Sequence, residues 1–137
     1  MILLDTVVLS ELRKRSPSAK VLAWLRTQRA EQLFISVVSL GEIERGIGKV
    51  QRTDAEFAQG LVIWLEDTML LYSDHILPVT APVARRWGRL SAELGHDGAD
   101  LLIAATALEH GLTVATRNVR HFKPSGAAVV NPFTAVS

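Results

Sequence analysis

Short apolar runs alternate along this chain with longer segments of helical periodicity, and this alternation limits the possible folds more than any other feature. Five runs are predicted to be strands: residues 2–4, 33–35, 76–79, 112–115 and 128–130. Their brevity and continuous apolar character indicate strands buried on both faces. Because strands joined by helical crossovers pair in parallel, the pattern predicts a three-layer α/β/α sandwich around a parallel sheet of about five strands.

Helical character is clearest in three of the intervening segments. Residues 99–108 are apolar almost all round, which predicts a helix buried against the sheet, and Gly111 is well placed to end it. The polar residues 49–56 are predicted to be the turn between two helices. With 137 residues and no repeat or linker, the chain is predicted to be a single domain, residues 1–137. Apolar residues recur at helical spacing in the two other segments: Val83, Trp87, Leu90 and Leu94, and Phe57, Leu61, Trp64 and Leu65.

Composition narrows the chemistry. Cysteine is absent, which excludes disulfides and thiolate metal sites, so any metal must be bound by Asp, Glu, His or Asn. The apolar start is interrupted at Asp5, and no run reaches the roughly 18 apolar residues of a membrane span, so a soluble, unexported, cytoplasmic protein is predicted. The net charge of +1 makes no case for nucleic acid by itself. The many arginines could contact phosphates or form a solvated basic surface.

Polar side chains follow the predicted strands, where open parallel sheets bind their ligands. Each of them also has a structural explanation. Asp5 could cap a helix that begins near Val8, and Asp100 could stabilise a helix N-terminus. The polar residues in question are Asp5 after the first run, Ser36, Ser39 and Glu42 after the second, Asp100 at the start of the buried helix, and Thr116 and Asn118 after the fourth run.

Three of these residues are carboxylates that the fold would bring to one end of the sheet. Glu42 lies among apolar residues, on or beside a packed face, and a buried carboxylate needs a partner. Three carboxylates at one strand end would repel one another, and a divalent cation would offset both the repulsion and the loss of water. Oxygen ligands favour Mg²⁺ or Mn²⁺ over zinc, and such a site suits hydrolysis of a phosphodiester bond.

At this point the chain closely resembles the PIN-domain family, in particular the VapC-type and FitB-type toxins of bacterial type II toxin–antitoxin systems. Four segments carry the resemblance, in order and at the family's spacing. They are residues 4–12 with Asp5, 39–47 with Glu42, 100–107 from Asp100, and 116–122 with Asn118. The resemblance covers nearly the whole chain.

The resemblance implies an endoribonuclease that cleaves single-stranded or loop RNA, often tRNA or rRNA, with Mg²⁺ or Mn²⁺. It also implies a homodimer and a small VapB-like antitoxin whose C-terminal segment covers the active site. Asp5, Glu42 and Asp100 match the first three acidic positions of the family, and Asn118 occupies the fourth. By this correspondence Asp5 and Asp100 are direct metal ligands, and Glu42 holds metal-bound water or a second ion.

Three positions depart from the family pattern. Val7 stands where the family usually has Asn, Asn118 is neutral, and His121 occupies a position where members with that Asn often carry an acid. These departures predict a site with three carboxylates rather than four. Such a site would bind a second metal ion more weakly, and its cleavage rate would be lower. Asp97 could supply the missing charge, because Gly98 permits a tight turn towards Asp100.

Two other functional classes fit the sequence less well. Many phosphatases with an aspartyl nucleophile need a second Asp where Val7 stands. A phospho-accepting receiver domain needs an acceptor Asp after a central strand and a Lys after a later one, and neither appears in this sequence. The serious alternative is a PIN-fold protein that binds RNA or its antitoxin but cleaves poorly.

Three apolar residues of the first helical stretches are predicted to form a surface that binds the antitoxin: Val21, Leu22 and Leu25. Two groups are predicted to lie outside the chemistry: the histidines, as solvated or capping residues (His75, His96, His110 and His121), and the tryptophans, as core or dimer contacts (Trp24, Trp64 and Trp87).

Overall fold

The computed structural model describes residues 1–134, in which five strands alternate with seven α-helices. The strands are β1 (Ile2–Leu4), β2 (Leu33–Ser36), β3 (Ile76–Leu77), β4 (Thr113–Ala115) and β5 (Val129–Val130). The helices are α1 (Thr6–Glu11), α2 (Ala19–Arg26), α3 (Val37–Gln51), α4 (Ala55–Leu71), α5 (Ala81–Leu94), α6 (Ala99–His110) and α7 (Val119–Phe122). No helix within residues 1–134 is both long enough and apolar enough to cross a membrane.

All five strands are parallel and form one sheet in the order β3-β2-β1-β4-β5. Leu4 is in register with Ile35 of β2 and with Ala115 of β4. The residues that follow these three strands therefore lie at the same end of the sheet, the carboxyl end of its strands. The chain passes from β1 towards β2 on one side and from β4 towards β5 on the other. In α/β proteins such a reversal of strand order opens a crevice for ligands, here between β1 and β4.

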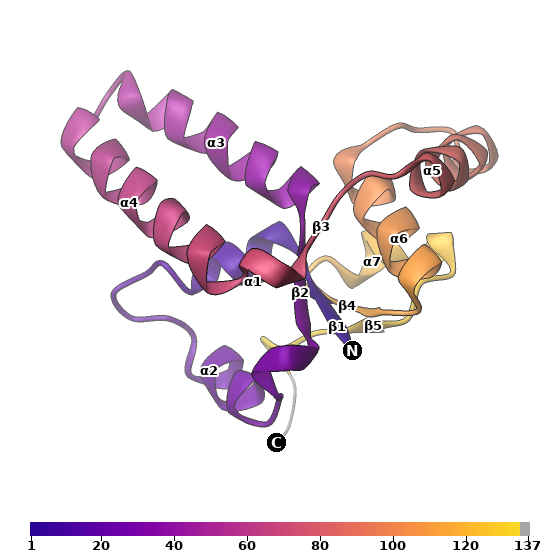
Figure 1. The fold of residues 1–137 in the computed structure, drawn as a ribbon, viewed down its shortest axis with the longest axis horizontal. Coiled ribbons are helices and arrows are strands. Elements are labelled where there is room, and N and C mark those ends of the chain that lie inside the picture. The colour runs from indigo at the N-terminus through magenta and orange to yellow at the C-terminus, as the bar shows by residue number, and fades with distance from the viewer. Residues whose placement is uncertain (135–137) are drawn as a thin grey trace.

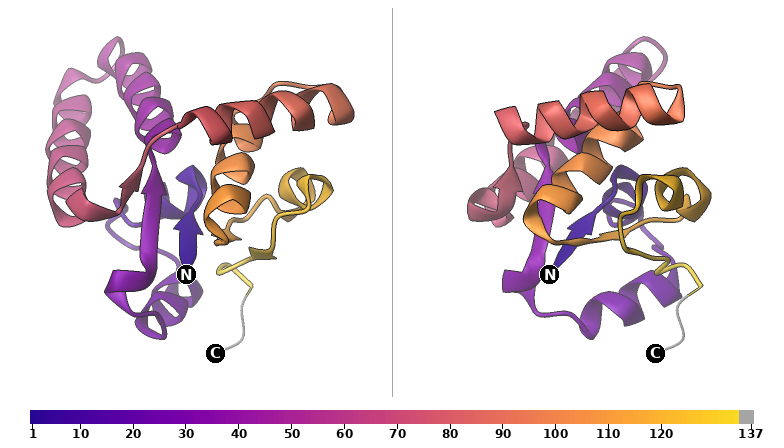
Figure 2. Two further views of the ribbon diagram at one scale, coloured as in Figure 1. Left: turned by 45° about the vertical axis from the view of Figure 1, so that its right-hand side comes forward. Right: turned by 90° about the vertical axis from the view of Figure 1, so that its right-hand side faces the viewer.

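Helices cover both faces of this sheet, which confirms the predicted three-layer sandwich (Figure 1). Successive residues of a strand point to opposite faces. Leu3 packs against Ile103 of α6, whereas Leu4 packs against Val8 of α1 and Val21 of α2. Figure 2 shows the hairpin of α3 and α4 on one side of the sheet and α6, backed by α5, on the other.

The predicted elements differ from the observed ones mainly at their ends. The third strand stops at Leu77 because Pro78 has no N–H to donate to a sheet. Helix α1 begins at Thr6 rather than near Val8. Gly111 ends α6 with a φ of 66°, a left-handed conformation that favours glycine, as expected from the sequence.

The predicted apolar surface on α2 requires a correction. Val21 is fully buried in a cluster with Leu4 and Val8, so it is a core residue, while Leu22 and Leu25 are partly exposed. Trp24 is also buried in this cluster, as the core interpretation of the tryptophans predicted.

Glu11 is a buried carboxylate that fixes the segment leading out of α1. Its Oε2 accepts a hydrogen bond from the Ser18 N–H at 2.8 Å, and its Oε1 lies 2.9 Å from Lys14 Nζ. The hydrogen bonds from Lys14 and Ser18 lower the pKa of Glu11 below its ordinary value of 4.5. This carboxylate therefore anchors the loop that carries the basic residues 13–15 beside α1.

Glu11→Gln is expected to lower the free energy of unfolding by about 1–3 kcal/mol at pH 7, because it removes a charge from two hydrogen bonds at a buried position. Since the pKa is lowered by folding, the contribution of Glu11 is present above pH 4.5 and is lost as the pH falls through the folded-state pKa. Urea unfolding at pH 7 and pH 3.5 measures this, and the difference from wild type should shrink at the lower pH. Glu31→Gln removes an exposed ion pair to Arg29 and should change stability by less than about 1 kcal/mol. An equal effect of both substitutions at pH 7 would contradict the anchoring role.

Candidate functional site

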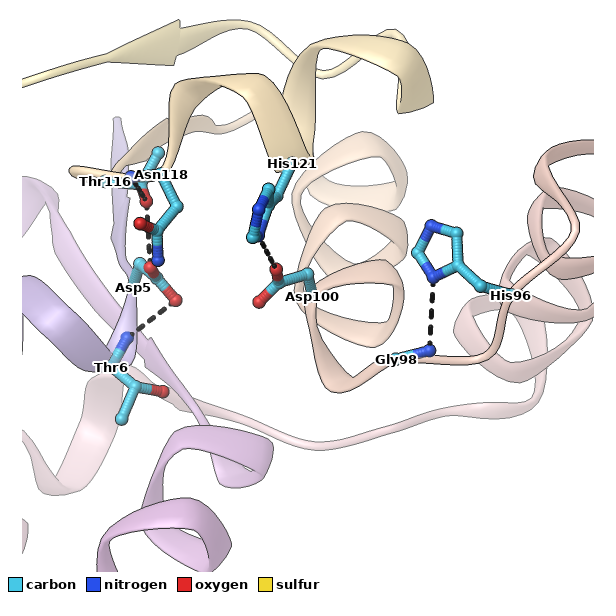
Figure 3. Close-up of polar contacts among 8 residues, drawn as sticks. All are labelled: Asp5, Thr6, His96, Gly98, Asp100, Thr116, Asn118 and His121. Carbon is cyan, nitrogen blue, oxygen red and sulfur yellow. Dashed lines mark hydrogen bonds and ion pairs between the residues drawn. The ribbon is translucent and has the colours of Figure 1, made fainter.

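Asp5 lies at the carboxyl end of the central strand, directly after β1, and only 2% of its surface is exposed. Its Oδ1 accepts a hydrogen bond from the Thr6 N–H, and its Oδ2 accepts one from the Thr116 hydroxyl, both at 2.8 Å (Figure 3). Asp5 is also the N-cap of α1. Asp5 thus has the capping role that was one of its two interpretations from the sequence. This role accounts for only one of its two carboxylate oxygens.

Burial raises the pKa of Asp5 from 3.8 to about 6. The hydrogen bonds from Thr116 and Thr6 lower it in part, and the negative charges of Asp100 and Glu42 raise it further. At neutral pH the carboxylate is therefore charged at a buried position where its hydrogen bonds do not make up for the lost water. A cation bound at this position would relieve that cost.

Glu42 extends from the first half of α3 and is partly buried. The Thr6 hydroxyl donates a hydrogen bond of 2.6 Å to Glu42 Oε1 and lies 2.8 Å from the hydroxyl of Ser39, which is fully buried. Thr6 thus touches Asp5 through its N–H and Glu42 through its hydroxyl, and so ties the two carboxylates to one residue. A carboxylate beside the packed face was predicted to need a hydrogen-bonding partner, and for Glu42 this partner is the Thr6 hydroxyl.

Asp100 lies in the first turn of α6, and 28% of its side chain is exposed. Its Oδ2 is 3.1 Å from Nδ1 of His121 on α7 (Figure 3). His121 is solvent-exposed, as predicted, but its contact with Asp100 was not expected. The imidazole therefore stands directly beside the Asp100 carboxylate.

Thr116 connects the end of β4 to Asp5. It is fully buried, it donates to Asp5 Oδ2, and its oxygen accepts a hydrogen bond of 2.9 Å from the Asn118 N–H. The Asn118 side chain projects from the start of α7 towards Asp5 (Figure 3). Asp5, Glu42, Asp100 and Asn118 thus come from four segments of the chain to the same end of the sheet.

Two clefts meet at Glu42. The larger, about 540 Å³, is lined mainly by polar and charged residues from α3, the loop before α6, α6 itself and α7: Glu42, Arg45, His96, Asp100, Arg120 and His121. The smaller, about 190 Å³, contains Thr6 and Glu42 and is otherwise lined mostly by apolar residues of α3 and α4, including Ile43, Ile47, Leu61 and Trp64. Glu42 therefore borders both the polar and the apolar cleft, whereas Asp100 borders only the polar one.

The donors at this end of the sheet fit a hard divalent cation. Among the side chains of residues 1–134, no three from His, Asp and Glu are already close enough together to form a complete metal site. The carboxylates are nevertheless electrostatically coupled, because Asp100 and Glu42 both raise the pKa of Asp5. Carboxylate oxygens with an amide oxygen nearby are the ligands that Mg²⁺ and Mn²⁺ prefer.

Sequence reasoning did not predict the roles of two hydroxyls. Thr116 was noted only as a polar residue after the fourth strand, and its hydrogen bond to Asp5 was not expected. Thr6, which binds Glu42, was not singled out, although it directly follows Asp5. Asp97 is exposed and does not line the larger cleft described for residues 1–134, although its neighbours His96 and Gly98 do. His75 is partly exposed, and it also stacks on Phe34 with its Nδ1 2.8 Å from the Leu33 carbonyl oxygen, contacts that the sequence did not reveal.

Comparisons with known proteins agree with this fold. The PIN domain profile matches residues 2–125. The chain is 33% identical to VapC ribonuclease Y4jK of Sinorhizobium fredii, over 97% of this chain and 98% of that protein. The crystal structure of FitAcB from Neisseria gonorrhoeae has a TM-score of 0.86 at 34% identity and covers 98% of this chain and 100% of its own. A toxin–antitoxin complex from Klebsiella pneumoniae has a TM-score of 0.69 at 25% identity, with 96% and 98% of the two chains covered.

Proposed function

Because the chain belongs to the PIN domain family, we propose that it is a metal-dependent endoribonuclease and the toxin of a type II toxin–antitoxin pair. Its substrate is RNA, with tRNA and rRNA as the candidates to test first. The relative named a VapC ribonuclease supports the activity. The observation that carries the proposal is Asp5, a carboxylate buried at the carboxyl end of the central strand with its pKa raised to about 6.

In this proposal Asp5 and Asp100 hold Mg²⁺ or Mn²⁺, and Glu42 holds water or a second ion. When bound, the ion would supply Lewis-acid stabilisation of the charge that develops on the phosphodiester. The Thr6 hydroxyl donates a hydrogen bond to one oxygen of Glu42, and the Thr116 hydroxyl donates one to an oxygen of Asp5. These hydrogen bonds orient the two carboxylates. Asn118 offers a neutral amide for a hydrogen bond to water or to the substrate, because Figure 3 shows its side chain directed towards Asp5.

The second candidate is a PIN-fold protein that binds RNA or its antitoxin and cleaves poorly. Two residues favour this candidate. Asn118, at the position that matches the family's fourth acid, is neutral, and His121 beside Asp100 adds no negative charge to the site. This candidate predicts RNA binding with a cleavage rate that hardly responds to metal.

Cleavage of an RNA panel in different metals separates the two candidates. We expect cleavage with Mg²⁺ or Mn²⁺, little with Ca²⁺, and none in EDTA, because phosphoryl transfer requires the compact octahedral geometry that Ca²⁺ does not favour. The products are followed by denaturing electrophoresis, with Asp5→Asn as the inactive control. Undiminished cleavage in EDTA would contradict the metal-dependent mechanism.

We further propose that the partner is a small VapB-like antitoxin whose C-terminal segment lies in the apolar cleft beside Glu42. The similarity to the Klebsiella pneumoniae toxin–antitoxin complex supports such a partner. An amphipathic segment could bury the apolar side chains of α3 and α4 there and direct a basic side chain at the carboxylates.

A homodimer in the cytoplasm completes the proposal. Large apolar side chains remain exposed along α4, including Ile63 (52%), Leu70 (76%) and Leu71 (79%). Exposed apolar patches of this kind are typical of protein interfaces. The cytoplasm is where the proposed tRNA or rRNA substrate is found.

A further inference from the structure

The larger cleft beside the acidic residues also contains two arginines that come from different helices. Arg45 lies three residues after Glu42 on α3, and Arg120 lies next to His121 on α7. Both arginines therefore line the same cleft as the two carboxylates Glu42 and Asp100. The cleft thus combines two positive with two negative side chains, so it offers groups for an anion as well as for a cation.

In the part of the chain that the structure describes, the arginines form no ion pair with these carboxylates. Within residues 1–134, neither Arg45 nor Arg120 is in an ion pair shorter than 4.0 Å, whereas Arg29 and Arg86 pair with Glu31 and Glu109. Glu42 accepts its hydrogen bond from Thr6, and Asp100 contacts His121. Both guanidinium groups are exposed and have their donors available for a ligand in the cleft.

The helices hold both arginines on rigid supports. Helix α7 is short, but Phe122 is fully buried in the core cluster that contains Leu3 and Ile103. Its burial holds the backbone close to Arg120 in place. Helix α3 packs along α4 and places Arg45 about one turn from Glu42. The backbone positions from which the two arginines extend are therefore set by the fold.

We propose that Arg45 and Arg120 bind a backbone phosphate of the RNA next to the scissile one, so that the single strand runs along the polar cleft. The planar guanidinium group matches the oxygens of a phosphate and can bind it through two parallel hydrogen bonds. The bound ion would neutralise the scissile phosphate, and the arginines neutralise its neighbour. The apolar cleft shares only Glu42 with the polar cleft, and it then remains for a protein partner.

This inference rests on the proposed function and is tested by RNA binding. Fluorescence anisotropy of a fluorescein-labelled single-stranded RNA is measured with Asp100→Asn, which prevents turnover, alone and combined with Arg45→Gln, Arg120→Gln or Arg89→Gln. Arg89 is exposed on α5 in a separate pocket and serves as the matched control. Each substitution in the cleft is expected to weaken binding roughly 10- to 100-fold and to reduce the slope of log K against log salt by about 0.7. Arg89→Gln should change affinity by less than about twofold.

Mn²⁺ binding provides a check on the integrity of the site. Arg45→Gln and Arg120→Gln, without the Asp100 substitution, should bind Mn²⁺ as the wild type does. The inference is overturned if, in the Asp100→Asn background, Arg45→Gln and Arg120→Gln bind RNA as tightly as Arg89→Gln does and leave the slope of log K against log salt unchanged. If the wild type cleaves RNA in that case, the proposed function stands and only the arginine assignment fails. If no form binds or cleaves RNA, both are wrong.

Discussion

Asp5→Asn is expected to abolish RNA cleavage and, at pH 7.5 without metal, to raise the free energy of unfolding by up to about 3 kcal/mol. The substitution removes a charge that folding buries, and its amide can still bond to Thr6 and Thr116. The upper figure follows from the shift of the Asp5 pKa from 3.8 to about 6, at about 1.4 kcal/mol per unit. The loss of cleavage follows from removing a proposed metal ligand.

The pH dependence of stability has a defined sign. Because the folded-state pKa of Asp5 is raised, the folded protein binds more protons than the unfolded chain between pH 4 and pH 6. Wild-type stability should therefore fall, relative to Asp5→Asn, as the pH rises through this window, and the difference should stay constant above it. Urea unfolding of both proteins in EDTA at pH 4, 5, 6 and 7.5 measures this. A difference independent of pH would show that Asp5 is not the charged, buried group described.

Asp100→Asn and Leu101→Ala are expected to have opposite effects although the residues are neighbours. Asp100→Asn should eliminate cleavage and leave the metal-free fold as stable or slightly more stable, because it removes one of the charges that act on Asp5. Leu101→Ala should cost roughly 2–5 kcal/mol, because Leu101 is fully buried in a cluster with Val83 and Leu90 and its truncation leaves a cavity. Its folded fraction should keep its cleavage activity.

Thermal melts with and without excess Mg²⁺, beside a cleavage assay, test this pair. Mg²⁺ should raise the melting temperature of the wild type and of Leu101→Ala by mass action, and that of Asp100→Asn much less. If Asp100→Asn unfolds the protein in EDTA or retains near-wild-type cleavage, Asp100 is a structural residue of the α6 N-terminus and its site assignment is wrong.

The fold was predictable because its signals are local. Apolar runs bounded by polar residues predicted all five strands, and the helices between them predicted that the strands are parallel. The order of the strands in the sheet was not predicted. The ends were less accurate where one residue decides the boundary, as with Pro78 after β3. The burial of Val21 was missed because a partly apolar helix does not reveal from its own sequence how many of its residues face the sheet.

The candidate site was predictable only in part. Position relative to the predicted strands and helices made Asp5, Glu42 and Asp100 candidates, and the family motifs pointed to the same three residues, because such signals are visible in neighbouring residues. Contacts between distant segments are not. The bond of Thr116 to Asp5 joins residues 111 positions apart, and the contact of His121 with Asp100 depends on how α7 packs against α6.

Direct titration with Mn²⁺ tests the central claim, that the carboxylates at this end of the sheet form one metal site. Calorimetry or electron paramagnetic resonance would follow Mn²⁺ binding to the wild type and to Asp5→Asn, Glu42→Gln and Asp100→Asn, with Asp97→Asn as the control outside the cleft. We predict that Asp5→Asn and Asp100→Asn each weaken binding at least about tenfold, Glu42→Gln less so, and Asp97→Asn not at all. Wild-type affinity in both Asp5→Asn and Asp100→Asn would contradict the account.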